Sequence, residues 1–162
     1  MTQPLLDRLL NQPDALHHLL AGLTEDQIRQ RPQSDKWSIS ENLAHLSRYQ
    51  DVFLARMKQI VAEEKPVFSR YVADNDPGFA DWTLLPLPGL TKNMVRSREA
   101  LNAYLSELPS EQLIRVGLHP AYGPMTVEGW TEFFLLHEAH HFFTILKLGG
   151  ALRTNEQPMG LH

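Results

Sequence analysis

The sequence predicts an all-α protein built as a four-helix bundle. Four segments, at about 4–22, 38–64, 90–107 and 126–150, carry apolar residues at three- and four-residue spacing. Such spacing is typical of helices that turn one face toward a core. Strand-like alternation is weak. The chain has 162 residues, 43% hydrophobic and 21% charged, which suits a single folded domain. We expect that domain to span 1–162.

The first predicted helix, at about 4–22, is rich in leucine at helical spacing. Pro4 suits its first turn, where a backbone N–H would have no helical partner. Pro13 removes an internal backbone donor, so it is expected to break or kink the helix. Gly22 can end the segment, because glycine readily adopts the conformation found just past helix ends.

The second long helix, at about 38–64, has a well-marked start and end. Ser38 and Glu41 form a capping-box pattern, in which each side chain bonds the other residue's backbone N–H. Thr24 begins a similar pattern upstream, which opens a short turn of helix. Lys65–Pro66 ends the long helix, because proline cannot continue it.

A long connection at 66–89, rich in proline and glycine, precedes the third helix at 90–107. Connections of this length are unusual in a compact bundle and often cover a functional site. A turn is predicted around 119–124, and Thr126 is placed as the N-cap of the last helix. Gly149–Gly150 is expected to end that helix and to leave the tail as a loop.

The last helix carries two candidate metal-binding histidines on its apolar stripe. The stripe consists of Trp130, Phe134, His137, His141, Thr144 and Leu148. His137 and His141 are one turn apart, which places their Cβ atoms about 5–6 Å from each other on one face. Imidazoles in an apolar stripe cost desolvation free energy unless their nitrogen atoms are satisfied, and a shared metal ion would satisfy them.

A third ligand is available from the second helix, where His45 lies at the edge of the apolar stripe. His45, His137 and His141 would give three nitrogen ligands and leave an open position for water or substrate. Nitrogen ligation suits zinc, nickel, iron or copper. His140 points elsewhere around its helix and is the weaker candidate, while Glu41 is a possible fourth ligand. Core packing of the histidines is the alternative without metal.

The letters of 137–141 also match HExxH, the zinc-peptidase motif in which the glutamate is a general base. Glu138 would hold that role. The extended form of the motif fails, because Thr144 stands where glycine is required. A downstream glutamate ligand would have to be Glu156, which follows the two glycines. The metallopeptidase interpretation is therefore a minor alternative.

Composition excludes several other classes. The formal net charge is −4, the pI is about 6.0, and no basic run of five residues occurs, so nucleic acid is not an expected partner. The absence of cysteine excludes disulfides and thiolate ligands. Neither a secretory signal nor an 18-residue apolar run is found, so we expect a cytoplasmic protein that does not bind membranes.

Taken together, three blocks resemble the DinB-like superfamily. They are W-S-I-S-E-N-L-A-H-L at 37–46, H-P-A-Y-G-P-M-T-V at 119–127 and L-H-E-A-H-H at 136–141. The resemblance runs from about Leu5 to Leu148. It implies a bundle of up-down-down-up type with a long crossover connection. It also implies one divalent metal, usually zinc or nickel, on His45, His137 and His141.

The resemblance carries expectations about activity and assembly as well. Relatives include metal-dependent transferases and isomerases that use low-molecular-weight thiols such as bacillithiol or mycothiol, and others are named as DNA-damage-inducible proteins or metal-dependent hydrolases. Relatives often form dimers, so a homodimer is expected. They commonly carry glutamine three residues after the last histidine, where this chain has Thr144. That difference puts in doubt a substrate contact or a role beside the metal, but it does not affect the three histidine ligands.

Two hypotheses remain open from the sequence. In the first, the chain is a metal-dependent enzyme, a thiol-dependent transferase or a hydrolase, acting on a small molecule. Glu41, Tyr49 and Glu138 are then candidates for acid–base work or for supporting the metal ligands. In the second, the metal is structural in a non-enzymatic stress-response protein. A closed site with a fourth protein ligand would favour the second hypothesis.

Overall fold

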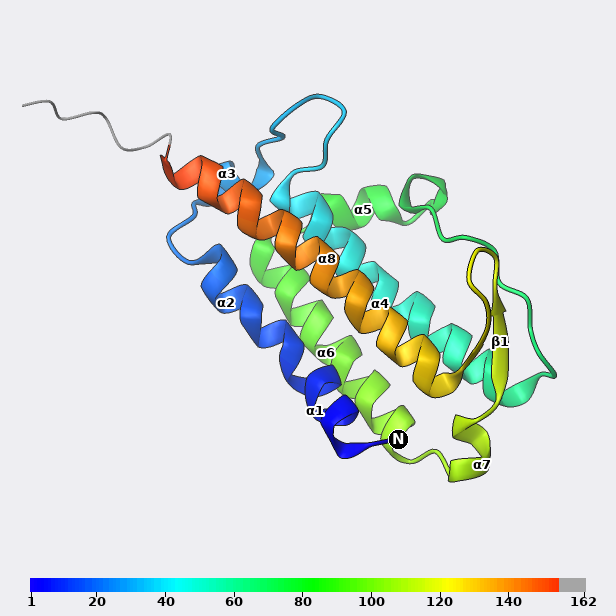
Figure 1. The fold of residues 1–162 in the computed structure, drawn as a ribbon. Helices are drawn as coiled ribbons and strands as arrows, with labels where there is room; N and C mark the ends of the chain where they lie inside the picture. Colours follow the sequence, from blue (N-terminus) through cyan, green and yellow to red (C-terminus); the bar gives the residue numbers. More distant parts are fainter. Residues whose placement is uncertain (155–162) are drawn as a thin grey trace, which may run out of the picture.

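The computed structural model describes residues 1–154, in which four long helical segments form a bundle (Figure 1). The first and last segments run in one direction and the two middle segments in the other, which confirms the up-down-down-up arrangement. The first segment is a broken helix and the others are continuous. The segments are α1 (Gln3–Asn11) with η1 (Gln12–Asp14) and α2 (Ala15–Leu20), then α4 (Ile39–Ala62), α6 (Leu87–Ser106) and α8 (Val127–Thr154).

Shorter elements fill the connections. They are α3 (Glu25–Arg29), η2 (Ala73–Asn75), α5 (Phe79–Thr83), α7 (Ser110–Leu113), β1 (Val116–His119) and β2 (Gly123–Thr126). The two strands form an antiparallel hairpin that begins at the Val116–Thr126 pair and closes at the His119–Gly123 pair. The sequence predicted the turn but not the strands, because four residues are too few to show a clear alternation.

The predicted starts of α3, α4 and α8 are confirmed by their hydrogen bonds, whereas α6 begins at Leu87, three residues before the predicted position. The Ser38 hydroxyl accepts from the Glu41 backbone N–H at 3.1 Å, and the Glu41 carboxylate accepts from the Ser38 N–H at 2.8 Å. Thr24 makes the corresponding capping box at α3. At α8, the Thr126 hydroxyl accepts from the Gly129 N–H at 3.1 Å. These side chains satisfy backbone donors that the first turn of a helix leaves without partners.

The predicted end of the last helix is wrong, because α8 continues through Gly149 and Gly150 to Thr154. Gly149 is buried against α2, where an added Cβ would lie 3.3 Å from the Leu23 side chain and 3.5 Å from the Leu19 carbonyl oxygen. The glycine therefore permits close helix packing rather than a stop. The rest of the predicted tail, 155–162, lies outside the described residues.

Two apolar clusters make the core, one in each half of the bundle. One is built around Leu43 of α4 and Ile145 of α8, and the other around Phe53 of α4 and Phe134 of α8. The polar side chains buried where these clusters meet are His45, Gln50, Arg98 and Glu138. Within the described residues, no helix is long and apolar enough to cross a membrane.

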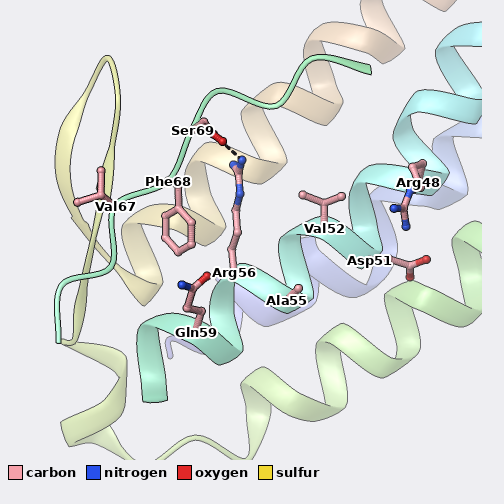
Figure 2. A pocket seen from close by; sticks show the side chains of 9 residues that line it. All are labelled: Arg48, Asp51, Val52, Ala55, Arg56, Gln59, Val67, Phe68 and Ser69. Atoms are coloured by element: carbon pink, nitrogen blue, oxygen red, sulfur yellow. Dashed lines mark hydrogen bonds between the residues drawn. The ribbon is translucent and has the colours of Figure 1, made fainter. Parts of the chain in front are cut away.

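The hairpin and the 66–89 connection lie together beside α4 (Figure 1). Gly117 of β1 packs so closely on α4 that an added Cβ would lie 2.7 Å from Ile60. The Phe68 N–H donates to the Leu118 carbonyl at 3.0 Å, which ties the connection to the hairpin. Arg56 of α4 reaches across to donate to the Ser69 carbonyl at 2.8 Å (Figure 2). These contacts fix the connection and the hairpin turn over one face of the bundle.

Candidate metal centre

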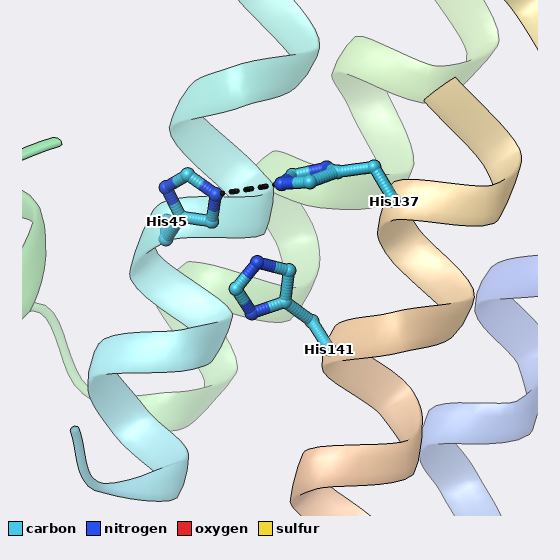
Figure 3. Close-up of side chains that lie close together, drawn as sticks. All are labelled: His45, His137 and His141. Carbon is cyan, nitrogen blue, oxygen red and sulfur yellow. Dashed lines mark hydrogen bonds between the residues drawn. The ribbon is translucent and has the colours of Figure 1, made fainter. Parts of the chain in front are cut away.

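Three imidazoles from two helices meet at one point between α4 and α8 (Figure 3). His45 comes from α4, and His137 and His141 come from successive turns of α8. One nitrogen from each ring can be chosen so that all lie within 4.8 Å of one another, and the Nε2 atoms of His45 and His137 are 3.1 Å apart. A tetrahedral zinc ion, with nitrogen ligands at about 2.0–2.1 Å, holds two such nitrogens roughly 3.3 Å apart.

All three rings are neutral near pH 7. Burial lowers the pKa of His45 and of His141 to about 3 and that of His137 to about 4, and neighbouring histidines add to the effect. Desolvation disfavours the charged imidazolium, so each ring keeps a lone pair that can bind a cation. The site therefore needs no proton release at neutral pH before a metal binds.

Asn42 fixes the tautomer of His141. Its side-chain N–H₂ donates to the Ser38 carbonyl at 2.8 Å, so its carbonyl oxygen must face the His141 ring. That oxygen lies 2.8 Å from Nδ1 of His141, which must therefore carry the proton. The lone pair of His141 is left on Nε2. Partners of this kind orient ligand histidines in metalloproteins and raise their basicity.

The hydrogen-bonding state of the other two rings fits a metal ion. Within the described residues, the buried Nδ1 atoms of His45 and His137 have no hydrogen-bond partner. Their Nε2 atoms face each other, and two neutral rings can share at most one hydrogen bond there. A divalent cation placed between the rings would take the lone pairs of both Nε2 atoms, and the Nδ1 atoms would then carry the ring protons. The donor set, three neutral imidazoles, suits a first-row metal such as zinc or nickel.

The three histidines line a cavity of about 710 Å³. Its walls are aromatic near the histidines, where the Trp37 ring is 5.2 Å and the Tyr71 ring 5.7 Å from the His45 ring, centroid to centroid. The rest of the lining includes other residues of the 70–74 segment and the hairpin turn at 119–122. A cavity of this volume with aromatic walls and a few polar groups is typical of small-molecule sites.

Of the candidates for acid–base work, Tyr49 lines the cavity. Its ring lies 4.9 Å from the His137 ring, and its hydroxyl accepts from the Arg56 guanidinium at 3.2 Å. Burial raises the pKa of Tyr49, while Arg56 acts in the opposite direction. Glu41 does not line the cavity. Its carboxylate caps α4 and pairs with Arg31.

Glu138 faces a different part of the core from the histidines on either side of it in α8. Its carboxylate pairs with the buried Arg98 and accepts from Gln12 at 2.7 Å and from Gln50 at 3.4 Å. It does not line the cavity. The general-base role that a metallopeptidase would assign to it therefore has no support in the geometry. Glu156, the candidate downstream ligand, lies outside the described residues.

The remaining sequence candidates lie at the edge of the site. His140 is exposed, and Thr144 donates from its hydroxyl to the His140 carbonyl at 3.1 Å. Both line a neighbouring hollow rather than the main cavity. Sequence reasoning missed Asn42, Arg56 and Tyr71. Asn42 and Arg56 share the helical face of His45, at three- and eleven-residue spacing, whereas Tyr71 lies in a connection without periodicity.

Comparisons with known proteins agree with this fold. Residues 8–145 match the family model of the DinB superfamily. The uncharacterized protein YuaE of Bacillus subtilis (strain 168) is 28% identical over 134 residues, which covers 75% of this chain and 83% of YuaE. The solved structure of YfiT from Bacillus subtilis, a probable metal-dependent hydrolase with an unusual four-helix bundle topology, superposes with a TM-score of 0.81. The superposition covers 94% of this chain and 90% of YfiT at 19% identity.

The fold and the site together define a class: a helical bundle of up-down-down-up topology with three convergent histidines that line a cavity. The family follows from the sequence match. The chain belongs to the DinB superfamily, as the match over most of its length shows.

Proposed function

We propose that the chain is a metal-dependent enzyme that binds one divalent cation, zinc or nickel, through His45, His137 and His141 and acts on a small molecule. The observation that carries this proposal is the convergence of three neutral imidazoles within 4.8 Å on the wall of a cavity. A bound cation of this kind supplies Lewis acidity and lowers the pKa of a water or thiol in its open position.

The chain's own residues would perform the other tasks of the reaction. Asn42 keeps the lone pair of His141 directed at the site. The rings of Trp37 and Tyr71 form apolar walls beside His45. These walls limit the access of water to the site and offer flat surfaces to a substrate. The Tyr49 hydroxyl accepts from Arg56, so its own proton is left to be donated to a bound molecule.

Hydrolysis and thiol transfer are the two reaction classes that this arrangement supports. The structural similarity to YfiT, a probable metal-dependent hydrolase, favours hydrolysis by an activated water. The family resemblance favours attack by a low-molecular-weight thiol on a small electrophile. Both reactions use the same three histidines and the same open position, and they differ in the nucleophile that enters the cavity.

The alternative of a structural metal has less support. A structural zinc site is closed by four protein ligands. Among residues 1–154, the convergent group of possible ligands consists of the three histidines, and the candidate fourth ligand Glu41 is held by Arg31 and Ser38. The cavity reaches all three histidines, which leaves room for a water or substrate.

The test is metal content, measured by elemental mass spectrometry on protein purified without an affinity tag or added metal. Wild type should carry near one equivalent of zinc or nickel, and His45→Ala should lose it. His17→Ala on α2, an exposed histidine away from the cavity, is the matched control and should keep it. If wild type takes up no metal even after reconstitution, the proposal is overturned.

We also propose that the chain forms a homodimer through the outer face of α8. Leu136, Phe143 and Leu146 share that face and are 62%, 60% and 50% exposed. Adjacent exposed apolar side chains of this size favour a partner surface. Analytical ultracentrifugation should show a dimer for wild type and a monomer for Phe143→Glu. Leu84→Glu directly after α5, a leucine that is 76% exposed, should leave the dimer intact.

A further inference from the structure

Arg56 is a buried cation without a carboxylate partner. Its side chain is 9% exposed, yet among the described residues no carboxylate lies within 4 Å of its guanidinium. Its protein acceptors are neutral oxygens, the Tyr49 hydroxyl and the Ser69 carbonyl. Buried charges are normally paired, because an isolated charge loses its hydration without a compensating partner.

Arg98 is the useful comparison, because it is a second buried arginine in the same bundle. It is 2% exposed and pairs with the Glu138 carboxylate, with the Gln50 amide as a further acceptor. The chain therefore does supply a carboxylate to a guanidinium that has only a structural role. At Arg56 the chain supplies three aromatic rings instead.

Those rings hold the guanidinium in place. Its carbon lies 5.8 Å from the Tyr49 ring centroid, 5.3 Å from that of Phe68 and 5.9 Å from that of Trp130. Such contacts favour a cation, but they do not use its N–H groups. A guanidinium has five N–H donors, so the two hydrogen bonds it makes within the described residues leave donors available.

Arg56 also lines the cavity that contains the three histidines. It lies eleven residues after His45 on α4, about three helical turns, so the two residues share a face. Tyr49 contacts both sides of the site, since its ring is 4.9 Å from the His137 ring and its hydroxyl is 3.2 Å from the guanidinium. One small molecule can therefore reach both the histidines and Arg56.

The other charged side chains that line the cavity are Arg70 and Asp74, both exposed. The cavity is thus cationic overall, although the chain carries a net charge of −4. A planar carboxylate matches the fork of a single guanidinium by accepting two parallel N–H bonds. Multiply charged anions such as phosphate are usually held by several donors.

We propose that Arg56 is the binding site for a carboxylate of the substrate, so that the enzyme acts on a small carboxylate-bearing molecule whose other end reaches the three histidines. This inference rests on the proposed function for the identity of the reacting end. The carboxylate subsite itself stands on the unpaired, buried and cavity-lining guanidinium.

The test compares acids with matched alcohols as probes of cobalt-loaded protein. A thiolate that binds cobalt gives a charge-transfer absorption band, so the band reports occupancy at the histidines. The probes are 3-mercaptopropionate and 6-mercaptohexanoate, each against the corresponding mercapto alcohol. Wild type should prefer at least one acid over its alcohol by about tenfold or more, as expected of a charge-assisted hydrogen bond in a buried site.

Three variants identify the origin of that preference. Arg56→Met keeps the length and apolar contacts of the side chain and should reduce the ratio to near one. Arg56→Lys keeps the charge but not the fork, and should retain part of the preference. Arg96→Met removes an exposed arginine from α6, away from the cavity, and should leave the ratio unchanged. An acid preference that persists in both Arg56 variants would overturn the assignment.

A metal-free arm separates this proposal from the proposed function. Calorimetric titration of metal-free protein with 3-phenylpropionate and 3-phenylpropanol should again show an acid preference that Arg56→Met abolishes. If neither thiol gives a cobalt band but this preference is present, the metal proposal fails and the carboxylate subsite stands. If thiols bind cobalt while acids and alcohols bind equally in both arms, the subsite is wrong and the metal centre stands.

Discussion

At the scale of single residues, the site depends on a side chain that neither binds metal nor lines the cavity. Asn42 is 3% exposed and uses both ends of its amide, one on the Ser38 carbonyl and one on His141. The first bond fixes the direction of the second, and the second fixes which nitrogen of His141 can bind a cation. The N-terminus of α4 is thereby connected to a ligand on α8.

We therefore expect Asn42→Ala to weaken zinc binding by about 10- to 100-fold, the usual cost of losing the partner of a ligand histidine. The reason is that His141 would be free to rotate and to adopt either tautomer. Competition with a fluorescent chelator at fixed pH measures this affinity. Asn102→Ala on α6, the same change away from the site, should bind zinc as wild type does. Equal affinities for wild type and Asn42→Ala would contradict the assigned role.

At the scale of the helices, α4 and α8 carry the site, and both could be predicted from the sequence. Their caps at Ser38 and Thr126 and their apolar stripes fixed the start and the inward face of each, and the four-residue spacing of His137 and His141 placed those rings together. The ion pair of Glu138 could not be predicted. The reason is that its partner Arg98 is on α6, forty residues away, and no local pattern joins them.

Glu138 and Arg98 allow a test of whether that pair serves stability alone. Glu138→Leu should destabilise the bundle by about 3–5 kcal/mol, because it leaves Arg98 as an uncompensated buried charge. Adding Arg98→Met should recover much of the loss. Urea denaturation of the metal-free proteins gives the free energies of unfolding. Metal stoichiometry should stay at one in Glu138→Gln, and loss of metal with unchanged stability would instead connect Glu138 to the metal centre.

At the scale of the whole molecule, the sequence predicted the bundle, the three convergent histidines and a 66–89 connection that covers a site, but not the contacts that hold the cover in place or the part played by the hairpin turn. The bundle follows from long periodic segments, which are strong signals. The cover consists of the 70–74 segment and the 119–122 turn, held by Gly117 packing and by a bond between Phe68 and Leu118. Such contacts join segments that are remote in the chain and carry no periodicity. Arg56 and Tyr71 line the cavity only because of that arrangement, so the sequence did not single them out.

The arrangement of the core predicts how the molecule responds to loss of metal. Each apolar cluster is packed from side chains, one around Phe53 and the other around Leu43. The histidines lie between the two clusters. The metal-free protein should therefore stay folded, with unchanged helical circular dichroism and a cooperative thermal transition. Metal at about a thousandfold excess over its Kd adds about 4 kcal/mol by mass action, which for a chain of this length raises Tm by roughly 10 °C.

His45→Ala should unfold near the Tm of metal-free wild type, and added metal should not raise its Tm. This result would show that the rise in Tm of wild type comes from metal bound at the three histidines. Differential scanning calorimetry with and without chelator measures both effects. A structural metal predicts a different result, because a fold that depends on its cation unfolds when the cation is removed. Collapse of the transition in chelator would therefore favour the structural alternative, whereas a folded metal-free bundle with an open cavity leaves the cation free for catalysis.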